Sequence, residues 1–225
     1  MKEAKTRHRH KQQLYQQFSQ IAAAMANPHR LELLDLLVQA PRTVEDLARE
    51  ADMSVANTSQ HLQRLKQARL VVGEREGLYM RYRLADPVVA RLWLQLRSVA
   101  EQQLADVERT LDAYRQRRHE FEPMQAEELL RRLRDNEVVL LDVRPTVEYE
   151  ARHLPGAVSI PWDELEQRLD ELPSGKTVVA YCRGPYCVYA DEALAILTER
   201  GWHARRLEAG VAEWEQAGYS LDSHL

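Results

Sequence analysis

The feature that most constrains the fold is a change of hydrophobic pattern in the middle of the 225-residue sequence. Before about residue 120, apolar residues recur mainly at spacings of three and four, the period of an α-helix. After that point, short β-branched runs alternate with helical patterns, which is typical of a parallel sheet covered by helices. The sequence therefore predicts two domains, and its length is sufficient for two small cores.

The charges divide at the same place. Residues 1–120 carry 20 Lys and Arg against 15 Asp and Glu, a net charge of +5, and residues 121–225 carry 11 against 20, a net charge of −9. A basic first half suits nucleic acid, and an acidic second half does not. The charged segment before Pro123 ends at a residue that cannot easily continue a helix. We predict a first domain at 1–118, a linker at 119–123 and a second domain at 124–225.

The first half carries the signals of three short helices. Leu34 and Leu37 lie on an apolar stripe that Pro28 precedes and Pro41 follows. Thr43 has an acid three positions later, which is the spacing of a capping box, and Ser54 can cap a third helix.

A β-hairpin is predicted after these helices. The segment 78–84 alternates between Leu, Met and Tyr on one side and Tyr and Arg on the other, and Gly73 and Gly77 bracket the turn before it. Three helices followed by a basic hairpin predict a winged helix-turn-helix.

The exposed face of the predicted third helix is rich in short or forked hydrogen-bonding side chains. A face that only meets solvent is more often filled with Glu and Lys, whereas these side chains can bond base edges in a major groove. The hairpin adds arginines. We predict binding to double-stranded DNA through Asn57, Ser59, Gln60, Gln63, Arg64, Arg75 and Arg81.

The segments "NPHRLELLDLL" and "SVANTSQHLQRLKQARLVVGEREGLYMRYRL" resemble the ArsR family of bacterial repressors, over roughly residues 15–115. The resemblance implies a recognition helix after Ser54, a wing, and a homodimer on an inverted-repeat operator. Many members sense metals through a Cys-x-Cys pair, but this first half contains no cysteine. His8 and His10 are better explained by a solvated basic tail, so no metal and no cofactor is predicted.

An apolar stripe runs from Val89 to Tyr114 at spacings of three and four. One continuous helix over about 28 residues would be about 40 Å long, which is more than a small domain covers. We expect it to pack against its own N-terminal helix and against a second copy of the chain.

The second half predicts an α/β domain with a parallel sheet. Buried strands are expected at 138–143 and 177–181, and helices at 126–135, 163–172 and 189–201. Ligands of such sheets bind beyond the carboxyl ends of the strands. Both cysteines of the chain stand there, in the turn "CRGPYC".

This turn has the residues of an anion-stabilising loop. Gly184 and Pro185 bend the chain so that N–H groups and the next helix N-terminus can face one hollow. Such a setting favours a thiolate, so Cys182 is the predicted nucleophile and Arg183 a donor to a small anionic sulfur carrier. A packing role for the cysteines is the plain alternative, and a zinc site lacks a second ligand pair.

The motifs "LLDVRPTVEYEARHLPGAVSIP", "YCRGPYCVYADEALAILTERGW" and "LEAGVAEWEQAGYSL" resemble the rhodanese sulfurtransferases across nearly all of 124–225. The resemblance implies a persulfide on Cys182. It also implies mainly structural roles for Asp142, Arg144, His153, Gly156 and Trp214.

Two positions depart from related patterns. Cys187 stands where many rhodaneses have a polar or cationic residue, and Val188 stands where related phosphatases and arsenate reductases need an arginine. A second thiol can attack a persulfide on Cys182, which gives a disulfide or a sulfur-bridged pair.

The sequence thus predicts a sulfur- or redox-responsive regulator that binds operator DNA as a homodimer and reads reactive sulfur through Cys182, with Cys187 as the second thiol. The alternative is a rhodanese-type sulfurtransferase whose winged helix dimerises or autoregulates. The start lacks a signal peptide, no run of about 18 apolar residues occurs, and the cysteines are few, so we expect a cytoplasmic protein with no membrane partner.

Overall fold

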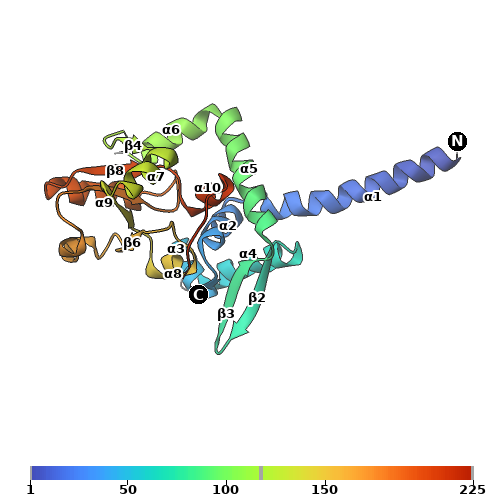
Figure 1. Cartoon of the computed structure of the whole chain (residues 1–225). Helices are drawn as coiled ribbons and strands as arrows, with labels where there is room; N and C mark the ends of the chain where they lie inside the picture. The colour runs from blue at the N-terminus through green and yellow to red at the C-terminus, as the bar shows by residue number, and fades with distance from the viewer. Residues whose placement is uncertain (1, 117–118, 224–225) are drawn as a thin grey trace. The chain divides into compact units, whose positions relative to one another are not determined.

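The computed structural model describes residues 2–116 and 119–223. Contacts divide the chain into two compact units, Met1–Leu96 and Arg97–Leu225. This division falls inside α5 (Pro87–Gln103), a helix whose residues belong in part to each unit (Figure 1). The predicted boundary at residue 118 lies outside the described residues.

The first unit is a winged helix-turn-helix, as predicted. The hairpin strands pair antiparallel, and β1 adds to β3 to give the sheet order β1-β3-β2 in the described chain. The hairpin stands out from the helices as the wing (Figure 1). Its elements are α1 (Lys2–Met25), α2 (Pro28–Gln39), β1 (Arg42–Thr43), α3 (Val44–Glu50), α4 (Val55–Gln67), β2 (Val71–Glu76) and β3 (Tyr79–Leu84).

The predicted helix caps are confirmed. Thr43 Oγ1 accepts the N–H of Asp46 at 3.1 Å, and Ser54 Oγ accepts the N–H of Asn57 at 3.2 Å. Each bond satisfies a donor that the first helical turn leaves without an intrahelical partner. These caps fix where α3 and α4 begin and therefore which face α4 turns outward.

The core of the first unit is built on the predicted stripes. Leu34 and Leu37 of α2 and Leu62 and Leu65 of α4 are buried against Tyr82 of the wing. Burial of one face of α4 leaves its polar face to solvent.

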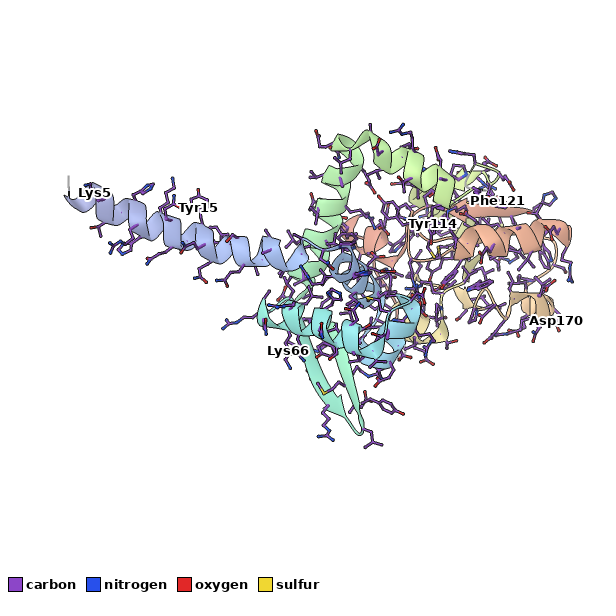
Figure 2. All side chains as sticks on the ribbon, turned by 180° about the vertical axis from the view of Figure 1, so that it is seen from behind. Lys5, Tyr15, Lys66, Tyr114, Phe121 and Asp170 are labelled. Carbon is purple, nitrogen blue, oxygen red and sulfur yellow. The ribbon has the colours of Figure 1, made fainter. Side chains whose placement is uncertain are left out.

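Helix α1 is packed only near its end. Ile21, Ala24 and Met25 join the core of the first unit. Leu14, Tyr15 and Phe18 are exposed, and Figure 2 shows the labelled Tyr15 side chain standing out from the helix. The early turns of α1 therefore present apolar groups without a cover from the described chain.

The prediction of a single continuous helix from Val89 to Tyr114 is wrong. The structure has α5 and a separate α6 (Ala105–Tyr114), with Leu104 between them in an extended conformation at φ −109° and ψ 101°. Neither proline nor glycine marks the break, and the apolar spacing continues through it. Spacing reports which residues share a face, and it does not detect a change of helix axis.

The second unit is an α/β domain, as predicted. All pairs of its described sheet are parallel, in the order β4-β8-β7-β5-β6. Its further elements are β4 (Pro123–Met124), α7 (Ala126–Arg134), β5 (Val138–Asp142), α8 (Thr146–Ala151), β6 (Val158–Ser159), η1 (Leu165–Gln167), η2 (Leu169–Glu171), β7 (Thr177–Tyr181), α9 (Tyr189–Glu199), β8 (Ala204–Leu207) and α10 (Val211–Gln216).

The α-helix expected at 163–172 is replaced by the two 3₁₀ turns η1 and η2. Leu165 and Leu172 are buried and Leu169 is packed against the same cluster. Two short turns bury these leucines before Pro173 ends the segment, so the apolar spacing was satisfied without an α-helix.

Both faces of the sheet are covered. Val178 and Ala180 of β7 belong to one buried cluster, and the alternate residues Val179 and Tyr181 belong to another. This alternation follows from the two-residue period of a strand. No helix among the described residues is long and apolar enough to cross a membrane.

Candidate functional site

Cys182 directly follows β7, at the carboxyl end of the parallel sheet. The loop then runs through Cys187 into α9. Both thiols are free, and the residues are only 1% and 9% exposed. Unless the loop moves, the site therefore admits only small reactants.

Two glycines allow this loop to pack closely. Gly184 has φ +106°, a conformation that L side chains rarely adopt. A Cβ on Gly210 would lie 2.5 Å from the backbone N of Gly184 and 2.9 Å from the carbonyl oxygen of Cys182. The turn before α10 therefore lies directly against the cysteine loop.

The environment separates the two thiols. Burial by itself raises the pKa of Cys182, but a hydrogen bond from the Cys187 thiol, the positive charge of Arg206 and the N–H of Ala190 together lower it to about 7. Burial raises the pKa of Cys187 well above its ordinary value, and its hydrogen bond to Cys182 and the negative charge there raise it further. The arrangement favours one thiolate, on Cys182, beside one protonated thiol.

Arg206 is a fully buried cation beside the sulfur. One of its guanidinium nitrogens, Nη2, lies 3.9 Å from Cys182 Sγ and donates to the carbonyl oxygens of Cys187 at 3.1 Å and Gly184 at 3.2 Å. Its Nη1 bonds Asp191 at 2.6 Å. The side chain thus holds both ends of the loop and a charge next to the nucleophile.

Sequence reasoning missed Arg206 because it lies 24 residues after Cys182 on another strand. One signal was present in the short strand "ARRL". Arg206 follows Ala204 by two positions, so both side chains lie on the same face of the strand, and a charged side chain is rare on a face that packs against the core. That signal does not say which side chain the charge meets.

Arg183, a predicted site residue, is paired within the protein. Its Nε and Nη2 donate to Glu148, which is fully buried, at 2.9 and 2.5 Å, and its guanidinium lies 5.3 Å from the ring centre of Tyr189. Its role in binding an anionic carrier stays a prediction, since a carboxylate already balances its charge.

A buried polar network lies beneath the loop. Asp142 accepts from the Arg144 guanidinium at 2.6 Å and from the Tyr181 hydroxyl at 2.5 Å. Tyr181 also accepts the N–H of Leu154 at 3.1 Å. These bonds fix the end of β7 and hence the origin of the loop.

Arg115, directly after α6, also reaches the loop. It is 2% exposed, donates to the carbonyl oxygen of Pro185 at 2.7 Å, and bonds Asp191 with both Nε and Nη2 at 2.7 and 3.0 Å. Asp191 therefore joins Arg115 to Arg206. No sequence pattern indicated this role, because it depends on the fold of a distant segment.

Residues of α5 that belong to the second unit contact the same region. Arg97 is paired with Glu213, and the Tyr186 hydroxyl is bonded to Glu101. Glu213 in turn accepts the N–H of Gly210 at 2.9 Å. The cysteine loop is thus bordered by α5 as well as by α9 and α10.

The structure places the predicted DNA-contact residues of α4 on one side of that helix. Asn57, Gln60, Gln63 and Arg64 are exposed, and Ser59 is half-buried. They are brought together because Thr58, Leu62 and Leu65 bury the opposite side. Such a face can enter a major groove.

Several of these groups have intramolecular partners. Gln63 Nε2 donates to the Tyr82 hydroxyl at 3.1 Å, which ties α4 to the wing. Arg81 is bonded to Glu76 and donates to the carbonyl oxygen of Pro41 at 3.2 Å. Arg75 is exposed and donates to the nearby Gly77 carbonyl oxygen at 3.2 Å. Gln60 and Arg64 remain the clearest candidates for base contacts.

Within the described chain, no group of three or more His, Cys, Asp and Glu residues has the arrangement of a metal site.

Two family models match the sequence. The model of the rhodanese-like domain matches residues 125–217, and that of the bacterial regulatory proteins of the arsR family matches residues 27–72. The two matches fall on the two described domains.

Individual proteins are similar to the chain over different lengths. The HTH-type transcriptional regulator Rv0324 of Mycobacterium tuberculosis is 43% identical over 209 residues, which cover 93% of this chain and 92% of that protein. A sulfurtransferase of Allochromatium vinosum is 32% identical over 98 residues, 43% of this chain and 90% of that protein. The homodimeric winged helix-turn-helix domain of Mb0332 from Mycobacterium bovis is 40% identical, with a TM-score of 0.41, and covers 43% of this chain and 89% of that structure.

Proposed function

The chain belongs to the ArsR family of transcriptional regulators and carries a C-terminal rhodanese-like domain, and from this premise we propose that it reads reactive sulfur at Cys182 and binds operator DNA as a homodimer. The observation that carries the sulfur proposal is the contrast between the two thiols. Cys182 lies 3.9 Å from the Arg206 cation and has a pKa of about 7, whereas Cys187 beside it stays protonated.

The proposed reaction has two balanced steps. The Cys182 thiolate attacks the sulfane sulfur of a donor, the donor S–S bond breaks, and the electron pair leaves with the departing thiolate. Cys187 then attacks the Cys182 sulfur of the hydropersulfide, loses its proton and expels hydrogen sulfide. The two cysteine sulfurs are oxidised to a disulfide and the sulfane sulfur is reduced to sulfide, so no other oxidant is needed.

DNA binding as a dimer is supported by two surfaces. The polar side of α4 has the side chains for base readout. Helix α5 exposes Val88, Leu92, Leu96 and Val99, which recur at helical spacing and form an apolar stripe. If a second copy covers this stripe about a twofold axis, operator binding requires the two α4 helices to lie about 34 Å apart, one turn of DNA.

A sulfurtransferase is the second candidate, and the Cys182 loop favours some reactivity of that kind. Both sulfurs are buried, so an acceptor must reach a persulfide that is covered by the loop. This burial favours sulfur sensing over repeated sulfur transfer to an acceptor. The two functions predict different rates of sulfur release to added cyanide or thiol.

The test is peptide mass spectrometry of full-length protein after brief treatment with each of several sulfane-sulfur donors, polysulfide and thiosulfate among them. The proposal expects at least one donor to add sulfur to Cys182, followed by a link between Cys182 and Cys187. In Cys187→Ser the reaction should stop at the Cys182 persulfide. Modification of Cys187 in a Cys182→Ser variant at the parent rate would overturn the assignment.

A further inference from the structure

The buried cations near Cys182 are matched by carboxylates. Arg206 lies 2.6 Å from Asp191 and 3.4 Å from Glu208. Arg115 is paired with the same two acids, at 2.7 and 3.4 Å. Both guanidinium groups are almost fully buried, so each needs this compensation.

The third cation of the loop is matched as well. Arg183 is paired with Glu148 at 2.5 Å. Arg115, Arg183 and Arg206 thus face three carboxylates, Asp191, Glu208 and Glu148. Arg97, which lies over the ring of Tyr186, is paired with a fourth carboxylate, Glu213. An ionised Cys182 leaves this group with a net charge of −1.

Three N–H groups around the two sulfurs are also engaged. The N–H of Ala190 bonds the sulfur of Cys182, and the N–H of Arg183 bonds the sulfur of Cys187. The N–H of Cys187 donates to the carbonyl oxygen of Gly184 at 3.3 Å. Cys187 therefore occupies a donor that would otherwise face a bound anion.

We infer that the sulfur donor of this site is a small organic hydropersulfide that carries no charge or one charge, and not a dianion such as thiosulfate. The inference rests on the proposed function and names its substrate class. A dianion meets repulsion from a site of net charge −1, and it must also lose water to approach a buried sulfur. A neutral hydropersulfide is not repelled by the charge of the site, and the free-energy cost of removing its water is smaller.

The same bonds form and break with each such donor. The Cys182 thiolate attacks the terminal sulfur of R–S–SH, the donor S–S bond breaks, and R–S⁻ leaves with the electron pair. Cys182 keeps the sulfane sulfur as a hydropersulfide. Thiosulfate would react in the same sense with sulfite as the leaving group, so charge and not mechanism separates the donors.

The experiment compares cysteine hydropersulfide, which carries at most one net negative charge, with thiosulfate on the full-length protein. Samples are quenched with iodoacetamide, and peptide mass spectrometry gives the rate at which unmodified Cys182 disappears. Each rate is measured from about 10 mM to about 0.5 M salt, over which repulsion between like charges is progressively screened. We expect salt to accelerate the thiosulfate reaction several-fold and the hydropersulfide reaction much less.

A charge variant tests the same point independently. Glu208 is 40% exposed at its side chain, so Glu208→Gln removes one negative charge without emptying the core. It should raise the thiosulfate rate about threefold or more and change the hydropersulfide rate less. Glu166→Gln is the matched control, because Glu166 is an exposed acid paired with Arg200, away from the loop in the described contacts.

The outcomes separate the two proposals. If thiosulfate reacts as fast as cysteine hydropersulfide and responds neither to salt nor to Glu208→Gln, the charge inference is overturned and the sulfur site stands. If neither donor adds sulfur to Cys182, the proposed function fails, and the substrate inference fails with it.

Discussion

The guanidinium of Arg206 lies 3.9 Å from Cys182 Sγ although 24 positions separate the two residues in the sequence. Strand β8 places Arg206 beside β7, and Asp191 holds its other nitrogen at 2.6 Å. This relationship supplies a buried positive charge where a thiolate forms.

The first prediction removes that charge. Arg206→Gln should raise the pKa of Cys182 above about 7, whereas Arg206→Lys should keep it closer to the parent value because the cation is retained. The measurement is the pH dependence of Cys182 alkylation by iodoacetamide. Arg200→Gln, which alters an exposed ion pair, is the control. Identical pH profiles for Arg206→Gln and the parent would contradict the assigned role.

The second prediction concerns pH in the parent protein. Because the pKa of Cys182 is lowered to about 7, its alkylation should fall by half as the pH drops through about 7, well below the ordinary thiol value of about 8.5. The stability that this thiolate adds is present above about 8.5 and is lost as the pH falls through about 7. Cys187, whose pKa is raised, should remain unmodified over this range. First reaction at Cys187 would refute the order.

The third prediction concerns the close approach of two backbone segments. Gly210→Ala should destabilise the second unit by about 3 kcal/mol, because the new Cβ meets backbone atoms that cannot move independently. Gly201→Ala is the control: φ is +82°, but no atom lies within 4 Å, so about 1 kcal/mol is expected. Calorimetry of the full-length protein measures both. Equal losses would show that packing at Gly210 is unimportant.

The fourth prediction concerns assembly. Leu96→Glu places a charge in the exposed α5 stripe and should convert a dimer to monomers with weakened DNA binding. Sedimentation velocity measures the change. Gln167→Glu adds the same charge in the second unit and should leave the dimer intact. Leu104 is a poorer site for this test than Leu96, because Leu104 lies at the break between α5 and α6 and not within a continuous helix. A dimer unaffected by Leu96→Glu would exclude this interface.

The fifth prediction concerns sequence readout. Gln60→Ala or Arg64→Ala should cost about 1 to 3 kcal/mol on the protein's own promoter and reduce its preference over random DNA. Arg75→Ala should weaken both DNAs alike, because the wing is expected to meet phosphates. Fluorescence anisotropy at fixed salt measures all three. An unchanged preference in the α4 variants would remove that helix from base readout.

The sequence was informative where local chemistry decides the structure. The caps at Thr43 and Ser54, the wing, and the strands that end at Asp142 and directly before Cys182 follow from turn residues and periodicity, and the structure confirms them. The break at Leu104 could not be predicted, because the apolar spacing is the same on both sides of it.

The same distinction applies to the site. The turn "CRGPYC" identifies the two thiols, since glycine, proline and cysteine are adjacent there. Arg206 and Arg115 are invisible from the turn because strand pairing and a distant helix bring them to it. Arg183 was placed correctly in the loop, but its ion pair with Glu148 depends on the fold of α8.

The central claim is that the sulfur state of Cys182 controls DNA binding, and one titration tests it most directly. Affinity for the protein's own promoter is measured before and after polysulfide treatment, with Cys182 modification followed by mass spectrometry in the same samples. The account predicts a change in affinity of about tenfold or more in the parent, in proportion to modified Cys182, and none in Cys182→Ser. Unchanged affinity with Cys182 fully modified, or an equal response in Cys182→Ser, would contradict it.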